Sequence, residues 1–223
     1  MKQLKTLSVL LMALGLLAGC GAQESAPEAP EELEAQEERI TLPAAPQVIE
    51  NPLTEWLPEG TLGQYGETEH LPELAAVIAE TYDIPEDAWA DTRYYYNYVD
   101  LNNDGTEEIF AVAMGMYTSG SGGDSGLLVQ PYAGMNVAQT FTLLRAPILV
   151  CDSETDGVHD LVYLRSGGGG GTDFVRLTCT DGVYTNPADA EALNGLEGIS
   201  GTAILCNDVM ADLEAGSALT LAG

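Results

Sequence analysis

Oxygen-bearing groups recur at alternate positions between residues 100 and 108, where the sequence DLNNDGTEE runs into the apolar segment IFAVA. The set consists of Asp100, Asn102, Asp104, the backbone carbonyl of Thr106, and Glu108. Hard cations prefer oxygen ligands, and Ca²⁺ takes six to eight of them at about 2.3–2.6 Å. Gly105 permits the sharp turn that would bring these groups together. The spacing therefore predicts a structural Ca²⁺ site in this stretch.

The stretch departs from an EF-hand at the twelfth position, where that loop needs a bidentate Glu and this sequence has Ala111. A nine-residue loop that ends in a carboxylate and then enters a strand resembles the calcium loops of FG-GAP and VCBS-type repeats. The resemblance implies a loop that joins two β-strands, with Ca²⁺ as a structural cofactor.

A second copy of the pattern begins at Asp152, 52 residues after Asp100. Its corresponding groups are Asp152, Glu154, Asp156, the backbone carbonyl of Val158, and Asp160. Glu154 stands where the first copy has Asn102, and its longer side chain fits a compact cage poorly, so we expect this site to be weaker or empty. The alternative is that Asp-Gly marks only a hairpin turn. Asp181-Gly182 is such a turn without the flanking ligands.

The first nineteen residues have the features of an export signal. Lys2 and Lys5 precede an apolar run at 7–17, and Leu17-Ala18-Gly19-Cys20 ends it. This ending resembles the lipobox of bacterial lipoproteins, which implies cleavage before Cys20 and attachment of acyl chains such as palmitate to that residue. An uncleaved span is disfavoured because it needs about 20 apolar residues. The expected location is the cell membrane, lipid-anchored, on the extracytoplasmic side.

Residues 20–47 are rich in Ala, Pro, Glu and Gln and contain few large apolar side chains. Such a segment cannot bury enough surface to offset its ordering entropy, so we predict a disordered acidic tether. Without the signal, five arginines and no lysine stand against 35 acidic residues. This charge excludes nucleic acid as a partner and excludes electrostatic attraction to anionic lipids, so the membrane contact must rest on the lipid of Cys20.

Residues 48–223 predict a single globular domain of the α+β class, mostly β. Apolar residues at helical spacing predict an amphipathic helix over Leu71–Tyr82, with Thr68 as its N-cap and its end before Pro85. A short helix is expected over Glu86–Asp91. Trp56, in an irregular lead-in, is expected to anchor that lead-in to the domain.

The rest of the chain repeats one plan: strand, acidic loop, strand, glycine-rich turn, strand. The two copies cover about residues 94–135 and 146–186. A duplicated antiparallel β-meander, open or sandwiched, with the helix packed on the sheet is the simplest arrangement. Between residues 96 and 187 the order of DLNNDG, SGSGG, RAPI, TDG, DLV, DGVY and NP resembles a class of secreted and periplasmic bacterial domains without assigned activity. That resemblance implies fold and compartment only.

The glycine-rich segments 119–126 and 167–171 lack the frame of a phosphate-binding loop, and no lysine is available for a Walker motif. Bulged hairpins or a close backbone approach explain them better, with ligand contact as the alternative.

Three cysteines, Cys151, Cys179 and Cys206, remain after Cys20. A meander would hold the first two about 9–10 Å apart, beyond the roughly 7 Å limit for a disulfide, so all three are predicted to be buried thiols.

We therefore predict a lipid-anchored, calcium-stabilised binding or interaction module rather than an enzyme, with an envelope protein or glycan as partner. One alternative is a hydrolase of envelope or other polysaccharides that uses the loop carboxylates Asp124 and Asp173 as acid and base, since two carboxylates suffice for that chemistry. Another is an inhibitor or chaperone of a second envelope protein.

Overall fold

The computed structural model describes residues 45–50, 52–166 and 171–223. The predicted signal, Cys20 and residues 20–44 of the predicted tether lie outside the described residues. Gln47, which we assigned to the end of the tether, already pairs with Gly63 in strand β1. The folded domain therefore begins slightly earlier than the composition suggests.

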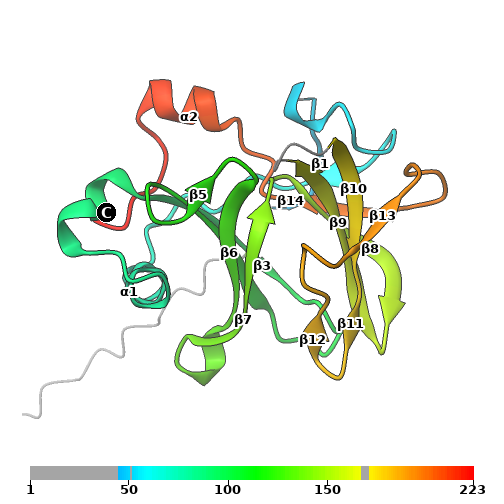
Figure 1. Cartoon of the computed structure of the whole chain (residues 1–223), viewed down its shortest axis with the longest axis horizontal. Helices are drawn as coiled ribbons and strands as arrows, with labels where there is room; N and C mark the ends of the chain where they lie inside the picture. Colours follow the sequence, from blue (N-terminus) through cyan, green and yellow to red (C-terminus); the bar gives the residue numbers. More distant parts are fainter. Residues whose placement is uncertain (1–44, 51, 167–170) are drawn as a thin grey trace, which may run out of the picture. The chain divides into compact units, whose positions relative to one another are not determined.

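Two sheets and one small hairpin make up the domain (Figure 1). The first sheet has the order β3-β4-β6, and both β5 and β7 pair with β6; its strands are β3 (Arg93–Val99), β4 (Glu108–Met114), β5 (Ser119–Gly120), β6 (Gly123–Gln130) and β7 (Asn136–Leu144). The second sheet runs β1 (Gln47–Val48), β2 (Leu62–Gly63), β14 (Gly201–Ile204), β8 (Ile148–Thr155), β9 (Val158–Ser166), β10 (Thr172–Leu177) and β13 (Glu191–Leu193). Strands β11 (Cys179–Thr180) and β12 (Val183–Tyr184) form the hairpin.

Each sheet contains one copy of the predicted repeat. Strands β3, β4 and β6 form an antiparallel meander in the first sheet, and β8, β9 and β10 form one in the second. The predicted fold class, mostly β with antiparallel sheets, is therefore confirmed. The parallel pairing of β2 with β14 was not expected. It joins a strand of the lead-in to a strand near the end of the chain.

A shared core lies between the two sheets. Phe110 and Phe141 of the first sheet and Leu161, Tyr163 and Val175 of the second are buried in it. The continuous apolar run of β4 is explained by its position, because its residues alternate between this core and a second core on the outer face of the sheet. Both faces of β4 are therefore buried from solvent.

Helix α1 (Pro72–Thr81) covers the outer face of the first sheet, as predicted, with Leu74 and Ile78 buried against the sheet. The predicted N-cap Thr68 was wrong: the cap position is Leu71, and no side chain caps the helix. Pro72 needs no hydrogen-bond partner at the first position, so the helix can start there without a capping side chain. None of the helices in the described part of the chain has the length and apolar character needed to cross a membrane.

Three short 3₁₀ helices and one further α-helix complete the fold. The 3₁₀ helices are η1 (Pro52–Thr54), η2 (Glu86–Asp91) and η3 (Pro131–Ala133). The helix predicted over Glu86–Asp91 is thus present as 3₁₀, with the Trp89 indole donating to the Ile84 carbonyl at 3.1 Å. Helix α2 (Val209–Ala215) was not predicted; Asp208 caps it, and none of its residues is buried.

The lead-in and the loop before β14 cover the outer face of the second sheet. Ile49, Trp56 and Leu196 pack there against a small cluster that includes Cys151 and Cys206. The Trp56 ring lies 5.4 Å from that of Phe174. The prediction that Trp56 anchors the lead-in is therefore confirmed.

Candidate functional site

The loop predicted to bind a metal, residues 100–108, joins β3 to β4 at one end of the two-sheet sandwich, and we call it the metal loop after that prediction. Leu101 is 2% exposed and inserts into the core between the sheets, which holds the first turn of the loop in place. Asn103 and Gly105 adopt positive φ angles of 57° and 85°, and Asn and Gly are the residues that tolerate this region best. Local sequence and a single apolar anchor therefore determine the path of the loop.

Side-chain oxygens of the metal loop point inward and accept its backbone N–H groups. Asp100 accepts from the amides of Asp104 (3.2 Å) and Gly105 (2.9 Å). Asn102 Oδ1 accepts from the amide of Asp104 at 2.9 Å, and Asp104 Oδ1 accepts from that of Thr106 at 2.7 Å. The bond from Thr106, followed by one from the Asn102 side chain, lowers the pKa of Asp104. The predicted ligands Asp100, Asn102 and Asp104 are thus brought together around one turn.

Glu108 closes the metal loop from a buried position. It is 5% exposed, and one of its oxygens accepts the Leu101 amide at 3.2 Å. Burial raises the pKa of Glu108, and charge repulsion from Asp104 and Asp100 raises it further. Three carboxylates therefore interact within one loop, and none of them forms an ion pair with a basic side chain in the described part of the chain. A bound cation would relieve this repulsion.

In the second repeat, most of the acidic positions lie in strands rather than in a loop. Asp152 to Thr155 continue strand β8, Val158 to Asp160 belong to β9, and only Asp156 and Gly157 form the turn. These two residues have φ angles of 52° and 78°, almost the same as the 51° and 78° of Asp181 and Gly182. A two-residue turn with both φ angles positive is typical of a tight hairpin. The backbone at Asp156-Gly157 is that of a hairpin turn, and calcium at the second copy stays a prediction.

Neighbouring hydroxyl groups donate hydrogen bonds to two acidic side chains of the second repeat, Asp160 and Asp152. Asp160 is 3% exposed, and its two oxygens accept from Ser153 and Thr155, both at 2.7 Å. Asp152 accepts from Ser200 at 2.6 Å. The predicted ligands Glu154 and Asp156 lie apart from these bonds, with Glu154 3.9 Å from the ring of His159.

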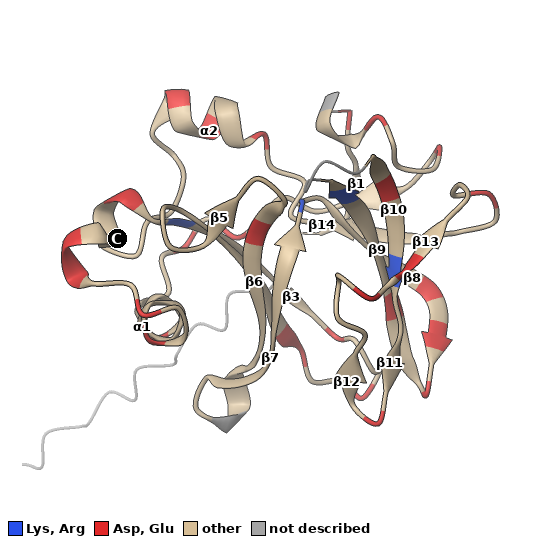
Figure 2. Cartoon of the chain, viewed as in Figure 1, with Lys and Arg blue, Asp and Glu red and all other residues tan. Residues whose placement is uncertain are grey.

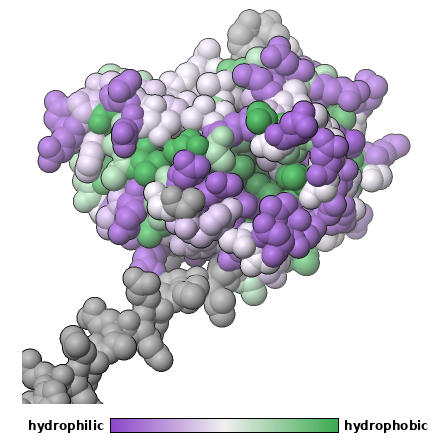
Figure 3. Space-filling model, turned by 90° about the horizontal axis from the view of Figure 1, so that it is seen from below, coloured by the Kyte–Doolittle hydropathy of each residue, from purple (hydrophilic) through white to green (hydrophobic). Residues whose placement is uncertain are grey.

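The two repeats meet at their acidic segments. The backbone amide of His159 donates to the carbonyl of Leu101 at 2.8 Å, and the Asn103 side chain donates to Glu154 at 2.8 Å. Asp100 and Asp152, which occupy equivalent positions in the two copies, line one hollow of about 250 Å³. Figure 3 shows this end of the domain from below, where hydrophilic side chains leave apolar areas between them.

The donor set of the metal loop suits a hard cation. All its members are carboxylate, amide or carbonyl oxygens, and of these groups only Asp100 lines the hollow. Acidic side chains are distributed over the whole domain, whereas basic ones are few (Figure 2). Within the described ranges, no three or more acidic, His or Cys side chains already converge on one point.

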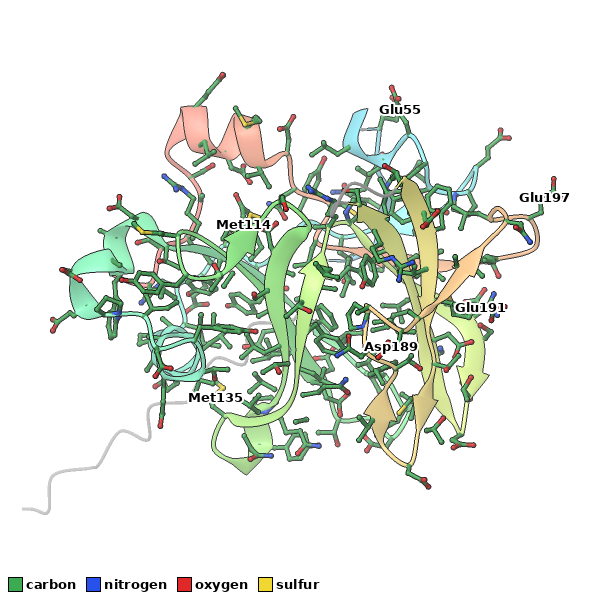
Figure 4. The ribbon with its side chains drawn as sticks, in the orientation of Figure 1. Glu55, Met114, Met135, Asp189, Glu191 and Glu197 are labelled. Atoms are coloured by element: carbon green, nitrogen blue, oxygen red, sulfur yellow. The ribbon has the colours of Figure 1, made fainter. Side chains whose placement is uncertain are left out.

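A second candidate site lies at the opposite end of the sandwich, where β4 ends at Met114 (Figure 4). A cavity of about 370 Å³ opens there, and we call it the Arg145 cavity. Its lining includes Asp124, one of the two carboxylates of the hydrolase alternative. Asp173, the other, is outside the lining and lies 3.6 Å from Arg165. The structure thus does not bring this acid and base into one cavity.

The sequence did not identify the Arg145 cavity. Its lining comes from six separate segments of the chain, including the lead-in, strands β4, β6 and β9 and the start of α2. No local periodicity or motif links such segments, so only the assembled fold places them together. Burial raises the pKa of Asp124, while the Ser119 hydroxyl, 2.6 Å away, and Arg145 both lower it.

The glycine-rich segment beside this cavity has a packing role. A Cβ on Gly123 would collide with the carbonyl of Leu144, and one on Gly126 would collide with the Leu144 side chain and lie 2.8 Å from the Ala111 carbonyl. The pairing of β6 with β7 shifts register between Asp124 and Gly126. The expectation of a close backbone approach with a bulge is confirmed for segment 119–126. Residues 167–170 of the second glycine-rich segment lie outside the described residues, so the expectation for that segment stays a prediction.

The three described cysteines are free and buried, as predicted. Burial raises the pKa of Cys151 to about 12 and that of Cys206 to about 11. A thiol with so high a pKa stays protonated at neutral pH and is a poor nucleophile. These cysteines therefore act as small apolar residues.

Comparisons of the chain with protein-family models, with curated proteins and with solved structures find no match. The geometry of the two candidate sites therefore carries the functional argument.

Proposed function

We propose that this chain is a membrane-anchored extracytoplasmic lipoprotein whose folded domain is a calcium-stabilised binding module. The observation that carries the proposal is the metal loop. Asp100, Asn102 and Asp104 wrap the turn, and the buried Glu108 carries a raised pKa because burial and two neighbouring carboxylates oppose its charge. Asp100, Asn102, Asp104, the Thr106 carbonyl and Glu108 would hold the ion.

A bound Ca²⁺ would supply structural stabilisation rather than chemistry. It would neutralise the repulsion among the loop carboxylates and fix the connection between β3 and β4. Because Asn103 and Leu101 tie this loop to β8 and β9, the same ion would stiffen the contact between the repeats. The weaker second set, Asp152, Glu154, Asp156, the Val158 carbonyl and Asp160, is proposed as an accessory site at most.

Lipid anchoring rests on the sequence Leu17-Ala18-Gly19-Cys20, which ends an apolar run after two lysines. The net charge of −28 supports attachment through acyl chains, since an acidic protein gains nothing from anionic headgroups. An envelope protein or a glycan is the partner class that fits an anchored module.

Fractionation of bacterial cells that express the full chain tests the anchor. The chain should sediment with membranes and enter the detergent phase, and Cys20→Ala should release it into the soluble fraction. Equal membrane retention of both forms would reject lipidation at Cys20.

Thermal melting with Ca²⁺, with Mg²⁺ and with chelator tests the metal site. The melting temperature should rise only with Ca²⁺, because Mg²⁺ demands a tighter octahedral geometry.

A further inference from the structure

The Arg145 cavity is mostly apolar, and its apolar side chains come from different layers of the fold. Met114 ends β4, Leu164 lies near the end of β9, and Trp56 belongs to the lead-in. Leu53 and Met210 line the cavity although they are 44% and 65% exposed. Apolar side chains that line a cavity and stay exposed are typical of a binding site rather than of a core.

Two carboxylates, those of Asp124 and Asp208, interrupt the apolar lining, and each has one oxygen already engaged. Asp124 Oδ1 accepts the Ser119 hydroxyl at 2.6 Å. Asp208 Oδ1 accepts the amides of Met210 and Ala211, both at 3.1 Å, and so caps α2. These bonds hold both carboxylates in place.

The second oxygen of each carboxylate is open to a ligand. Within the described ranges, Oδ2 of Asp124 and Oδ2 of Asp208 have no hydrogen-bond or ion-pair partner. Neither atom belongs to the buried polar atoms that lack a partner, so both keep accessible surface. A carboxylate oxygen that is partly removed from water and has no partner favours a bound cation.

Among the described residues of the lining, Arg145 alone is basic. It donates through Nη2 to the Ser121 carbonyl at 3.2 Å, and its Nε is buried, so the guanidinium is held against the glycine-rich turn. Burial raises the pKa of Asp124 more than the Ser119 hydroxyl and the charge of Arg145 lower it. Arg145 therefore leaves Asp124 short of positive charge, and the lining carries two negative charges against one positive charge.

We propose that the Arg145 cavity binds an apolar ammonium ion, a small organic molecule with a single positive charge. The free oxygens of Asp124 and Asp208 would accept its N–H groups, of which a primary ammonium has three. Its apolar body would fill the space beside Trp56, Met114 and Leu164. This proposal rests on the proposed binding function and deepens it by naming the site and the class of its ligand.

Charge complementarity favours this cation over a neutral or anionic ligand. The lining has a net negative charge, and the chain carries 35 acidic against seven basic residues, so its field attracts cations and repels anions. Trp56 adds an aromatic ring, the kind of surface on which an ammonium ion is attracted electrostatically. A bare Ca²⁺ fits this cavity poorly, because a mostly apolar lining cannot supply six or more oxygen ligands.

The test is a titration of the purified chain with 2-phenylethylammonium chloride, followed by NMR of methionine methyl and tryptophan indole signals. Saturable shifts of Met114, Met210 and Trp56 are expected, whereas Met116 and Trp89, which lie outside the lining, should not shift. 2-Phenylethanol has nearly the same apolar body without the charge, and methylammonium has the charge without the body. Both should bind at least about tenfold more weakly.

Asparagine variants separate the two carboxylates from the field of the whole protein. Asp208→Asn keeps an oxygen that can cap α2, and Asp124→Asn keeps an acceptor for Ser119. Each should weaken binding about tenfold, the effect of one charge-assisted hydrogen bond. Asp181→Asn removes the same charge in the β11–β12 hairpin, outside the lining, and should leave binding unchanged because salt screens distant charges. Unchanged melting temperatures show that the variants are folded.

Several outcomes would overturn the proposal. Absence of saturable shifts at Met114 and Met210 would exclude the cavity as the site. Equal binding of 2-phenylethanol would reject the need for a charge, and equal or tighter binding of zwitterionic L-phenylalanine would reject a singly charged cation as the ligand class. Equal weakening by Asp181→Asn would assign the effect to the field of the whole protein rather than to the two lining carboxylates.

Calcium added to the same samples separates this proposal from the metal site. Loss of probe binding with retained calcium binding counts against the cavity alone. Probe binding without calcium binding counts against the metal loop alone.

Discussion

The side-chain amide of Asn103 donates a 2.8 Å hydrogen bond to Glu154, and this bond joins the metal loop of the first repeat to the hairpin of the second. The backbone bond from His159 to the Leu101 carbonyl lies beside it. Glu154 occupies the third position of the second copy, where it looked too long for a compact cage. In the structure its length lets it reach the neighbouring repeat instead.

Asp104→Asn should weaken calcium binding by about tenfold or more, because a ligand charge is lost while an oxygen remains for the Thr106 amide. The melting temperature should fall in millimolar Ca²⁺ and change little in chelator. Asp181→Asn in the β11–β12 hairpin is the matched control, since that Asp-Gly turn has no flanking ligands. Equal losses with and without calcium would count against a metal role for Asp104.

Glu108→Gln should have opposite effects in the two conditions. The raised pKa of Glu108 means that its ionised form opposes folding, so neutral Gln should hold or raise the melting temperature in chelator. In Ca²⁺ the same change removes a charged ligand and should lower it. A loss in chelator as large as the loss in Ca²⁺ would contradict this account.

The pH dependence of stability in chelator follows from the same group. For an acid whose pKa is raised on folding, the stability contribution is greatest below its ordinary value of 4.5 and falls as the pH rises through the folded-state pKa. The difference in free energy of unfolding between Glu108→Gln and the unaltered chain should therefore grow from pH 4 upward and then level off. Urea titrations across this range measure it, and a flat difference would show that Glu108 is not perturbed.

Asp160→Ala should destabilise the domain by nearly the same amount in chelator and in Ca²⁺. The change removes the two hydrogen bonds that the buried Asp160 carboxylate accepts from Ser153 and Thr155, and the loss of bonds to a charged group should cost about 1–3 kcal/mol in the free energy of unfolding. Denaturant unfolding in chelator measures the loss. A further loss that appears only in millimolar Ca²⁺ would show that the second copy also holds an ion.

Gly126→Ala tests the packing role of the glycine-rich segment. Its new Cβ would meet the Leu144 side chain and the Ala111 carbonyl, and overpacking of this kind costs about 1–3 kcal/mol. Gly120→Ala is the control, because a Cβ there would meet nothing within 4 Å. Similar stability of the two variants would contradict the close-approach explanation.

Local patterns were enough to predict the meanders, helix α1 and the course of the metal loop. The two acidic copies nevertheless diverge in structure. Asn102 and Asn103 favour a loop, whereas Ser153 and Thr155 continue a strand and bond to Asp160, so β8 runs on to a two-residue turn. Sequence alignment of the copies could not reveal this difference, because it depends on which side chains meet across the finished hairpin.

The elements that the sequence did not reveal depend on long-range contacts. Helix α2 is only seven residues long and has no buried residue, so its pattern is too short to stand out in the sequence, although Asp208 and Gly216 mark its ends. Strands β2 and β14 are two and four residues long and pair from distant parts of the chain. The Arg145 cavity likewise exists only once these segments are in place.

The most direct test of the account is a calorimetric titration of the purified chain with Ca²⁺. We expect saturable binding with a dissociation constant of about 10⁻⁴–10⁻³ M, as in extracellular modules, and its loss in Glu108→Gln. Absence of binding heat, together with equal melting temperatures in Ca²⁺ and in chelator, would contradict the central claim that residues 100–108 form a calcium site.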